Sequence, residues 1–269
     1  MKPIWIIENL EQSFLELSEA AKELGHEVID INRGYEHNLI SKVRGKCVIF
    51  SGSIEMTKLV GNHLILQANK PSYYCNWKKY KCSAFYGKLG GYLFNDNHCF
   101  IPLAELNRRK YFFYGLFGKE CLIFVRPDGG DKSFKGGLVD LQDFDSFYEE
   151  FKIKECDLVV VSSPKTIRGE WRFVVTSEKK ILAQSSYRYQ GQAVKIPSAP
   201  NGATDLCKKI LDEGYFPDDV FCIDICEDND GNFWLMELTS FSSAGLYAGD
   251  KKKIVEGVSE MATKNFIDR

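Results

Sequence analysis

The chain lacks the short motifs that identify most zinc proteins and many nucleotide-binding proteins. It has no CxxC pair and no HExxH motif, and its four histidines are scattered along the sequence. A zinc site needs clustered cysteine and histidine, so these absences argue against one. No GxGxxG follows a predicted strand, and no GxxxxGK[ST] occurs, so the usual dinucleotide fingerprint and the Walker A loop are absent.

Long apolar runs are also missing. The run Leu158–Val161 is far shorter than the ~20 residues of a membrane-spanning helix, and the N-terminal MKPIWIIENLEQ turns acidic too early for a signal peptide. The nine cysteines are an odd number, which favours reduced, buried thiols over a disulfide framework. We therefore expect a cytoplasmic protein with no membrane segment.

Charge of neither sign dominates. The 269 residues include 35 basic and 37 acidic side chains, a net charge of −2, so a general nucleic-acid footprint is not indicated. The segment 76–100 is aromatic and basic, and it has two interpretations: a nucleic-acid or partner surface, or ordinary helix and loop packing with solvated lysines. We favour the second, because long lysine side chains commonly cover apolar surface.

The pattern of apolar residues predicts an α/β chain in two parts. Strands at 4–7, 26–31 and 46–50 alternate with helices at 14–24 and 54–68, which is typical of a small parallel sheet. From residue 120 the pattern changes to strands and hairpins with helices at 144–151, 203–211 and 250–264. We predict an N-terminal α/β domain at 1–115 and a second domain at 116–269, with 101–118 as the link.

The most informative segment is FCIDICEDNDGNFWLMEL, residues 221–238. Two apolar strands flank Asp228-Asn229-Asp230-Gly231, a strong hairpin turn signal. In the register centred on Asn229 and Asp230, Asp224 and Glu237 are diagonal neighbours on one face, about 7–8 Å apart at the backbone. Two carboxylates on an apolar face favour a bound cation, and Mg²⁺ suits oxygen ligands that also hold substrate phosphates. A bulge would weaken this prediction by turning one carboxylate away.

Two further segments carry basic residues suited to anions. VRPDGGDKSFKGG joins Arg126 at a strand end to a glycine-rich loop with Lys132 and Lys135, and such a loop can bring N–H and ammonium groups to phosphates. The alternative is an ordinary turn with exposed lysines. In EWRFVV, Glu170 and Arg172 share a strand face, where the arginine either binds an anion or forms a surface ion pair.

These motifs, in the order VRPDGGDKSFKGG, VVVSSPKTI, EWRFVV and IDICEDNDGNFWLMELTSFSSAGLYAGD, resemble the ATP-grasp superfamily over residues 116–250. More narrowly, the chain resembles the arginine-plus-two-lysines clade found in bacteria and phages, in which arginine replaces the strand lysine. Arg126 fits that replacement. Lys135 and Lys165 are our choices for the two lysines, with Lys132 as a competitor.

The resemblance implies an ATP-grasp fold preceded by a small parallel α/β domain. It also implies an ATP-dependent, Mg²⁺-dependent ligase that joins a small-molecule, amino-acid or peptide carboxylate to an amine or thiol acceptor through an acylphosphate. The implied roles are as follows: Arg126, Arg172 and Lys135 catalytic; Arg126, Lys132, Lys135, Val161, Ser162, Lys165 and Arg172 around ATP; Asp224, Glu237 and Thr239 at the metal.

The chain departs from the family pattern at two positions. Thr239 stands where many members have asparagine, and Ser162 and Ser163 stand where many place a ribose-binding glutamate. Two other functions therefore stay open, a non-catalytic nucleotide- or partner-binding protein on the same scaffold and another phosphoryl transferase. The absence of HRD and DFG motifs counts against a protein kinase.

Overall fold

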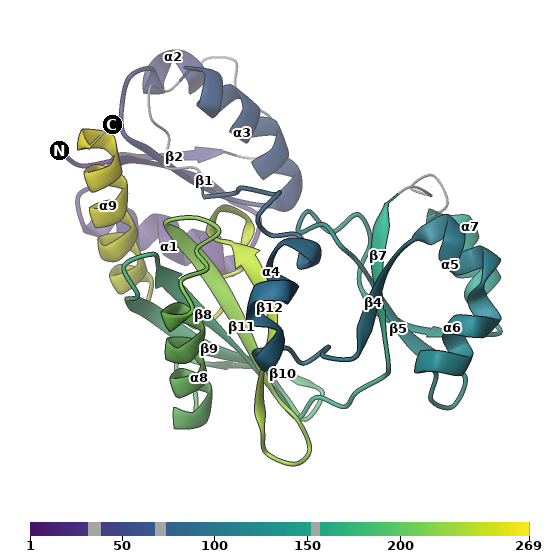
Figure 1. The fold of residues 1–269 in the computed structure, drawn as a ribbon. Coiled ribbons are helices and arrows are strands. Elements are labelled where there is room, and N and C mark those ends of the chain that lie inside the picture. The colour runs from purple at the N-terminus through teal and green to yellow at the C-terminus, as the bar shows by residue number, and fades with distance from the viewer. Residues whose placement is uncertain (32–38, 68–73, 152–156, 269) are drawn as a thin grey trace.

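The computed structural model describes residues 1–31, 39–67, 74–151 and 157–268. Within them the strands form three sheets that lie in separate parts of the molecule (Figure 1). The two ends of the chain lie near each other, beside the C-terminal helix. The described helices include none long and apolar enough to cross a membrane.

The N-terminal sheet is parallel, as predicted, with strand order β2-β1-β3. Its central strand is buried along its whole length, which explains the unbroken apolar run IWII. Gly25 ends the first helix with φ +73°, a conformation that glycine adopts without strain. The predicted helix stop at Lys70-Pro71 lies outside the described residues. The elements are β1 (Ile4–Glu8), α1 (Gln12–Glu23), β2 (Val28–Ile31), α2 (Leu39–Val43), β3 (Val48–Ser51) and α3 (Ile54–Gln67).

The second sheet is antiparallel, in the order β4-β7-β5-β6, and helices cover one of its faces (Figure 1). The segment 101–118, predicted as a link, instead forms the end of a strand and two helices whose apolar side chains fill this sheet's core. The predicted boundary between residues 115 and 116 falls inside α6, and β4, which begins at His98, pairs with β7 in this sheet. The elements are β4 (His98–Pro102), α5 (Leu103–Arg108), α6 (Lys110–Phe117), β5 (Leu122–Pro127), β6 (Gly137–Asp140), α7 (Phe144–Phe151) and β7 (Leu158–Ser162).

The third sheet is also antiparallel, with order β10-β9-β8-β11-β12. Helix α8 and the earlier helix α4 (Cys82–Leu89) pack on one face, and α9 packs with the N-terminal sheet on part of the other. The helix predicted at 203–211 is present with slightly wider bounds, and the helix predicted at 250–264 begins one residue later and ends three residues later. The elements are β8 (Gly169–Thr176), β9 (Ile181–Tyr189), β10 (Gln192–Ile196), α8 (Asn201–Asp212), β11 (Val220–Glu227), β12 (Phe233–Ser240) and α9 (Lys251–Ile267).

The register of the β11–β12 hairpin differs from the simplest one. Glu227 pairs with Phe233, and a bulge between Asp224 and Ile225 shifts the ladder by one residue. As a result Asp224 lies directly opposite Glu237, not diagonal to it. The bulge was expected to separate the two carboxylates, but with this turn it aligns them, because directly opposed residues point to the same face.

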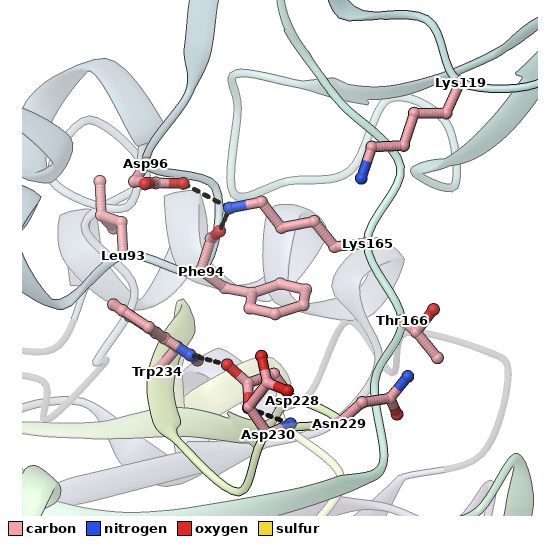
Figure 2. A pocket seen from close by; sticks show the side chains of 10 residues that line it. All are labelled: Leu93, Phe94, Asp96, Lys119, Lys165, Thr166, Asp228, Asn229, Asp230 and Trp234. Carbon is pink, nitrogen blue, oxygen red and sulfur yellow. Dashed lines mark hydrogen bonds and ion pairs between the residues drawn. The ribbon is translucent and has the colours of Figure 1, made fainter.

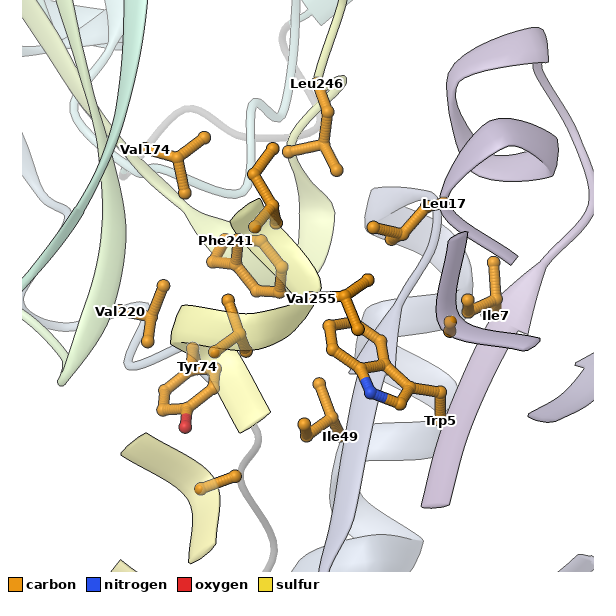
Figure 3. Packing of buried hydrophobic residues seen from close by; sticks show 14 of the residues in the cluster. Trp5, Ile7, Leu17, Ile49, Tyr74, Val174, Val220, Phe241, Leu246 and Val255 are labelled. Carbon is orange, nitrogen blue, oxygen red and sulfur yellow. The ribbon is translucent and has the colours of Figure 1, made fainter. Parts of the chain in front are cut away.

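One apolar cluster joins the N-terminal sheet to the third sheet (Figure 3). Trp5 and Ile49 enter it from the parallel sheet, Val220 from β11, and Phe241 from the turn after β12. The Phe241 ring meets Trp5 edge-on at 6.4 Å between ring centroids. These contacts link the two halves of the chain into one core.

The described cysteines are all free, and most are buried as predicted. Two of them are exceptions: Cys99 is only partly buried, and Cys121, just before β5, is exposed. Cys156 lies outside the described residues. The thiols thus serve mainly as small apolar side chains.

Candidate functional site

Three charged side chains lie side by side across the centre of the third sheet. Arg172 on β8 pairs with Asp224 on β11, which in turn pairs with Glu237 on β12. Side chains at directly paired positions share a face, so all three project to the same side of the sheet. Asp224 is fully buried and Arg172 is 6% exposed. Asp224 and Glu237 therefore share a face, as predicted, and Arg172 lies beside Asp224 on the same face.

Arg172 donates three of its five N–H groups to acceptors within the protein. Its Nε and Nη2 atoms donate to the two carboxylate oxygens of Asp224 at 2.7 and 2.5 Å. Its Nη1 donates to the carbonyl oxygen of Gly245 at 3.0 Å, in the loop that follows β12. A two-pronged pair of this kind fixes geometry as well as charge. Arg172 thus joins the carboxylate row to the loop that follows β12.

Burial and the opposite charge of the partner shift the pKa values of Asp224 and Arg172 in opposing directions. Burial raises the pKa of Asp224 to about 6, and the adjacent Arg172 opposes that rise. Burial acts to lower the pKa of Arg172, but Asp224 outweighs it and holds that pKa well above the ordinary value. Near neutral pH both groups carry charge, which a hard cation requires of a carboxylate ligand.

Glu237 is held by cations that come from the second sheet and its glycine-rich loop. Arg126 Nη2 on β5 lies 3.1 Å from Oε2, and Lys132 Nζ lies 3.1 Å from Oε1. Burial acts to raise the pKa of Glu237, but Lys132, Arg126 and Arg172 outweigh it and hold the pKa far below its usual range. Arg126 and Lys132 thus converge on the metal candidate Glu237.

Thr239 lies two residues further along β12, on the same face as Glu237. Its hydroxyl donates to Glu237 Oε1 at 3.3 Å, and only 8% of the residue is exposed. A threonine oxygen thus lies beside the Glu237 carboxylate, and its role as a third metal ligand stays a prediction. No group of three His, Cys, Asp or Glu side chains suited to a metal occurs among the described residues.

The glycine-rich loop is anchored on both sides of Lys132. Asp128 accepts from the backbone N–H of Ser83 at 2.7 Å and from its hydroxyl at 2.9 Å, at the start of α4. Phe134 is buried against the helix α7. A side chain on Gly136 would lie 2.7 Å from the Cβ of Arg126, so that position needs glycine. Lys135 is exposed and makes no contact with the carboxylate row.

Val161 and Ser162, predicted to contact the nucleotide, are both fully buried. The Val161 side chain lies in the core of the second sheet, and the Ser162 hydroxyl donates to Asn95 at 3.3 Å. Val160 pairs with Arg126 across β7 and β5, so its side chain shares the face of Arg126. Val161 remains a predicted nucleotide contact, and the neighbouring Val160 has its side chain on the face of the second sheet that carries Arg126.

Lys165 lies apart from the carboxylate row, in the strand connection after β7. It contacts the carbonyl oxygen of Phe94 and the carboxylate of Asp96. Figure 2 shows it at a cavity of about 300 Å³ with Lys119 nearby and the β11–β12 turn opposite. In that turn Asp228 accepts from the Trp234 indole at 2.7 Å. Arg126, Asp224 and Glu237 are not among the residues that line this cavity.

Two tyrosines that sequence analysis did not select flank Arg172. The rings of Tyr187 and Tyr247 stack at 4.6 Å between centroids, and the guanidinium carbon lies 5.8 and 5.2 Å from those centroids. Cation–π contacts of this kind are worth about 0.5–2 kcal/mol. The sequence shows both tyrosines, but nothing in their spacing predicts that β9 and the loop after β12 meet at Arg172.

Comparison with protein families identifies the family of this chain. The model of the ATP-grasp domain, R2K clade family 2, matches residues 109–256, more than half of the chain. The chain therefore belongs to the ATP-grasp superfamily. Within it, the matching group is the R2K clade, the arginine-plus-two-lysines group that the motifs resembled. A comparison with curated protein sequences found no match.

Solved structures share the fold at low sequence identity. D-alanine–D-alanine ligase from Bacillus anthracis is 13% identical, with a TM-score of 0.61, and the alignment covers 100% of this chain and 99% of that one. D-cycloserine synthetase DcsG is 10% identical, with a TM-score of 0.64 and coverage of 96% and 99%. A RimK domain ATP-grasp protein from Sphaerobacter thermophilus is 15% identical, with a TM-score of 0.59 and coverage of 98% and 99%. At these identities the likeness establishes the fold.

Proposed function

We propose that this protein is an ATP-dependent ligase that joins a carboxylate to an amine, or alternatively to a thiol, through an acylphosphate. One observation carries the proposal: the buried carboxylate of Asp224 and the partly buried carboxylate of Glu237 lie directly opposite each other, and Glu237 meets cationic side chains from a second sheet and its loop. Acidic ligands on one side and phosphate-binding cations on the other are what phosphoryl transfer from ATP requires.

The residues present fit Mg²⁺ held jointly by protein and nucleotide. Mg²⁺ in proteins is usually bound by one or two carboxylates and by substrate phosphates, so a third acidic side chain is not needed. Asp224 and Glu237 would supply the carboxylates, and Thr239 would contact the metal or its water. When bound, the metal would neutralise charge on the phosphates during transfer.

The basic residues divide into three roles. Arg126 and Lys132, already at the carboxylate row, would bind phosphate oxygens, and Lys135 would reach the same phosphates from the exposed part of the loop. Lys165 would bind the nucleotide from its separate cavity, next to Ser162 and the backbone of Val161. Because three of the five N–H donors of Arg172 are taken by Asp224 and Gly245, its primary task would be to position the metal ligand and the loop.

The reaction would proceed in two transfers. A carboxylate oxygen of the first substrate attacks the terminal phosphorus of ATP, and ADP leaves, which gives an acylphosphate. The amine nitrogen then attacks the carbonyl carbon, the bond to the phosphate oxygen breaks, and inorganic phosphate leaves while the nitrogen loses a proton. The protein supplies position and charge, so no nucleophilic side chain is required.

The names of the structural neighbours support amino-acid or peptide substrates. They include D-alanine–D-alanine ligase and an ATP-grasp ligase, PsnB, in complex with its precursor peptide. We propose the same substrate class here, a small-molecule, amino-acid or peptide carboxylate with an amine acceptor.

A non-catalytic nucleotide-binding role is the second candidate. It is favoured by Thr239 in place of asparagine and by the internal cations that occupy the carboxylates. Incubation with Mg-ATP and a panel of amino acids and short peptides separates the candidates. The ligase predicts ADP, inorganic phosphate and an amide in equal amounts. A stable phosphoester would indicate another phosphoryl transferase, and nucleotide binding without turnover would indicate the binding role.

A further inference from the structure

The glycine-rich loop begins at a buried carboxylate that the proposed mechanism does not use. Asp128 is 3% exposed. It lies two residues after Arg126 and four residues before Lys132, the two cations that contact both oxygens of Glu237. The groups that fix Asp128 therefore set the point from which the loop leaves β5.

Asp128 is fixed to two other segments through both its backbone and its side chain. Its N–H donates to the carbonyl oxygen of Leu158 on β7 at 3.0 Å, and its own carbonyl oxygen accepts from the N–H of Cys82 at 2.9 Å. Its two carboxylate oxygens accept from Ser83, one from the backbone N–H at 2.7 Å and the other from the hydroxyl at 2.9 Å. Cys82 and Ser83 are the first two residues of α4, so Asp128 joins the second sheet to the start of that helix.

Helix α4 packs against the sheet that carries the carboxylates. Its buried side chains lie in one apolar cluster with residues of β8, β11 and β12. The contact between Asp128 and α4 therefore relates the loop to the third sheet, on which Glu237 lies. A carboxylate at the first turn of a helix also stabilises the helix, so a purely structural cap is the alternative role.

The backbone conformation of Lys132 needs support from its surroundings. Lys132 has φ +48°, in the left-handed region that a lysine adopts at a cost in free energy. The neighbouring Asp131 pairs with Lys58 of α3 at 2.8 Å, but these side chains are 37% and 46% exposed, so the ion pair contributes little. Of these two ties to other segments, the buried one at Asp128 is the stronger.

We propose that Asp128 is a positioning residue for Lys132. By holding Ser83 at the start of α4, its carboxylate fixes the direction in which the loop leaves β5. This keeps the Lys132 ammonium group at Glu237 and within reach of a nucleotide phosphate. The phosphate contact rests on the proposed function, whereas the contact with Glu237 is present in the structure.

Release of the anchor should have opposite effects on two ligands. A metal ion alone should bind more tightly, because Lys132 is then free to leave Glu237 and no longer competes for the carboxylate. Mg-ATP should bind more weakly, because a cation for its phosphates is no longer placed in advance. A loss of helix stability alone predicts no such opposition.

Two variants of the full chain release the anchor to different extents. Asp128→Ala removes both side-chain hydrogen bonds, and Ser83→Ala removes only the one from the exposed hydroxyl. Asp128→Ala should raise the affinity for Mn²⁺ alone about threefold, measured by electron paramagnetic resonance of free Mn²⁺, and lower the affinity for Mg-ATP about tenfold, measured by calorimetry. Ser83→Ala should shift both affinities in the same directions by less. Asp128→Asn keeps an oxygen acceptor for the Ser83 N–H and should restore most of the wild-type behaviour.

The matched control is Asp140→Ala, which removes the same charge and the hydrogen bond from Gln142 N–H at 2.8 Å. Asp140 pairs with Leu122, at the end of β5 away from the loop, so this variant should bind both ligands like the wild type. Unchanged affinities in Asp128→Ala and Ser83→Ala, or affinities that fall together, would overturn the positioning role. Urea unfolding identifies any loss of fold, and Ser83→Ala decides if Asp128→Ala does not fold.

The effect on metal binding has to pass through Lys132. In the Lys132→Met background, Asp128→Ala should leave the Mn²⁺ affinity unchanged, because the competing ammonium group is already absent. A further rise of about threefold in that background would show that Asp128 acts by another route, and it would overturn the assignment.

Failure of the positioning role and failure of the ligase give different results. If the wild type converts Mg-ATP to ADP but both anchor variants keep its affinities, the ligase stands and the positioning role is wrong. If Asp128→Ala raises the Mn²⁺ affinity through Lys132 but the wild type does not bind Mg-ATP, the positioning role stands and the nucleotide-dependent function is wrong.

Discussion

Both oxygens of the Glu237 carboxylate have cationic partners, and in the proposed function a metal ion would displace one of them. Arg126 is largely buried, whereas the Lys132 side chain is 41% exposed and sits in the anchored loop. Lys132 is the partner that can leave with least rearrangement. A divalent cation that binds Glu237 must compete with its ammonium group, since two like charges at one carboxylate repel.

Removing that competitor should strengthen binding of metal alone. Lys132→Met is expected to raise Mn²⁺ affinity in the absence of nucleotide about tenfold, measured by the electron paramagnetic resonance of free Mn²⁺. Lys135→Met is the control, because Lys135 is in the same loop but makes no contact with Glu237. Equal Mn²⁺ affinity in the wild type and Lys132→Met would show that Lys132 does not occupy the metal position.

We expect the effects of Arg172→Met and Asp224→Asn on the free energy of unfolding to be non-additive, because the two side chains form one buried ion pair. Arg172→Met leaves a fully buried carboxylate without its partner and should lower the free energy of unfolding by about 3–5 kcal/mol. Asp224→Asn in the Arg172→Met background should restore part of that loss. Urea unfolding of the two single variants and the double variant gives the coupling, and strictly additive losses would contradict the pair.

At the scale of elements, the connection that leads into β11 carries a partly buried acid of its own, Asp218. Asp218 accepts from the backbone N–H of Asn76 at 3.0 Å, which ties the segment before α4 to the third sheet. Burial raises the pKa of Asp218 to about 6, while the Asn76 N–H, Tyr80 and Lys79 oppose the rise and Asp219 adds to it. The connection therefore keeps a carboxylate that would ionise more readily in the unfolded chain.

This shift makes the contribution of Asp218 to stability depend on pH in a defined direction. The folded pKa is about 6 and the reference value is 3.8, so ionisation above pH 6 destabilises the fold and protonation below it relieves the penalty. Asp218→Asn keeps an oxygen acceptor for Asn76 and should raise the free energy of unfolding by about 1–2 kcal/mol at pH 7. The gain should disappear near pH 3.5. Urea unfolding at both pH values measures the gain in stability. A gain independent of pH would show that the raised pKa of Asp218 is not its cause.

For the whole molecule, the shared core predicts that the two halves of the chain unfold together. Phe241 is fully buried between Trp5 and Tyr74, with centroid distances of 6.4 and 6.1 Å. Phe241→Ala should lower the free energy of unfolding by about 3–5 kcal/mol through the cavity it leaves. Phe112→Ala, at a residue 53% exposed, should cost less than about 1 kcal/mol.

Cooperativity is the informative part of that experiment. Fluorescence and circular dichroism should follow one common transition in the wild type and in Phe241→Ala, because the cluster spans both halves. Separate transitions for the N-terminal sheet and the remainder would show that the shared core does not couple them.

The sequence alone determined the features that depend on local pattern. The apolar run of β1, the alternation in β11 and β12 and the Asp228–Gly231 turn predicted their elements correctly, because periodicity reports burial directly. The order of the motifs identified the superfamily. The shared face of Asp224 and Glu237 was also predicted, although through a register that the structure corrects.

Tertiary structure decided what depends on contacts between segments distant in sequence. The bulge opposite Asp224 comes from the whole ladder, and no local signal gives its position. Arg172 reaches Gly245 and Lys132 reaches Glu237 across 73 and 105 residues, respectively. Likewise, residues after β1 and β3 meet the loop after β12 only because the sheets pack together, as in the hydrogen bond from Gly52 N–H to the Ser242 carbonyl oxygen. Local pattern fixes which face a side chain takes, but only packing fixes what it meets there.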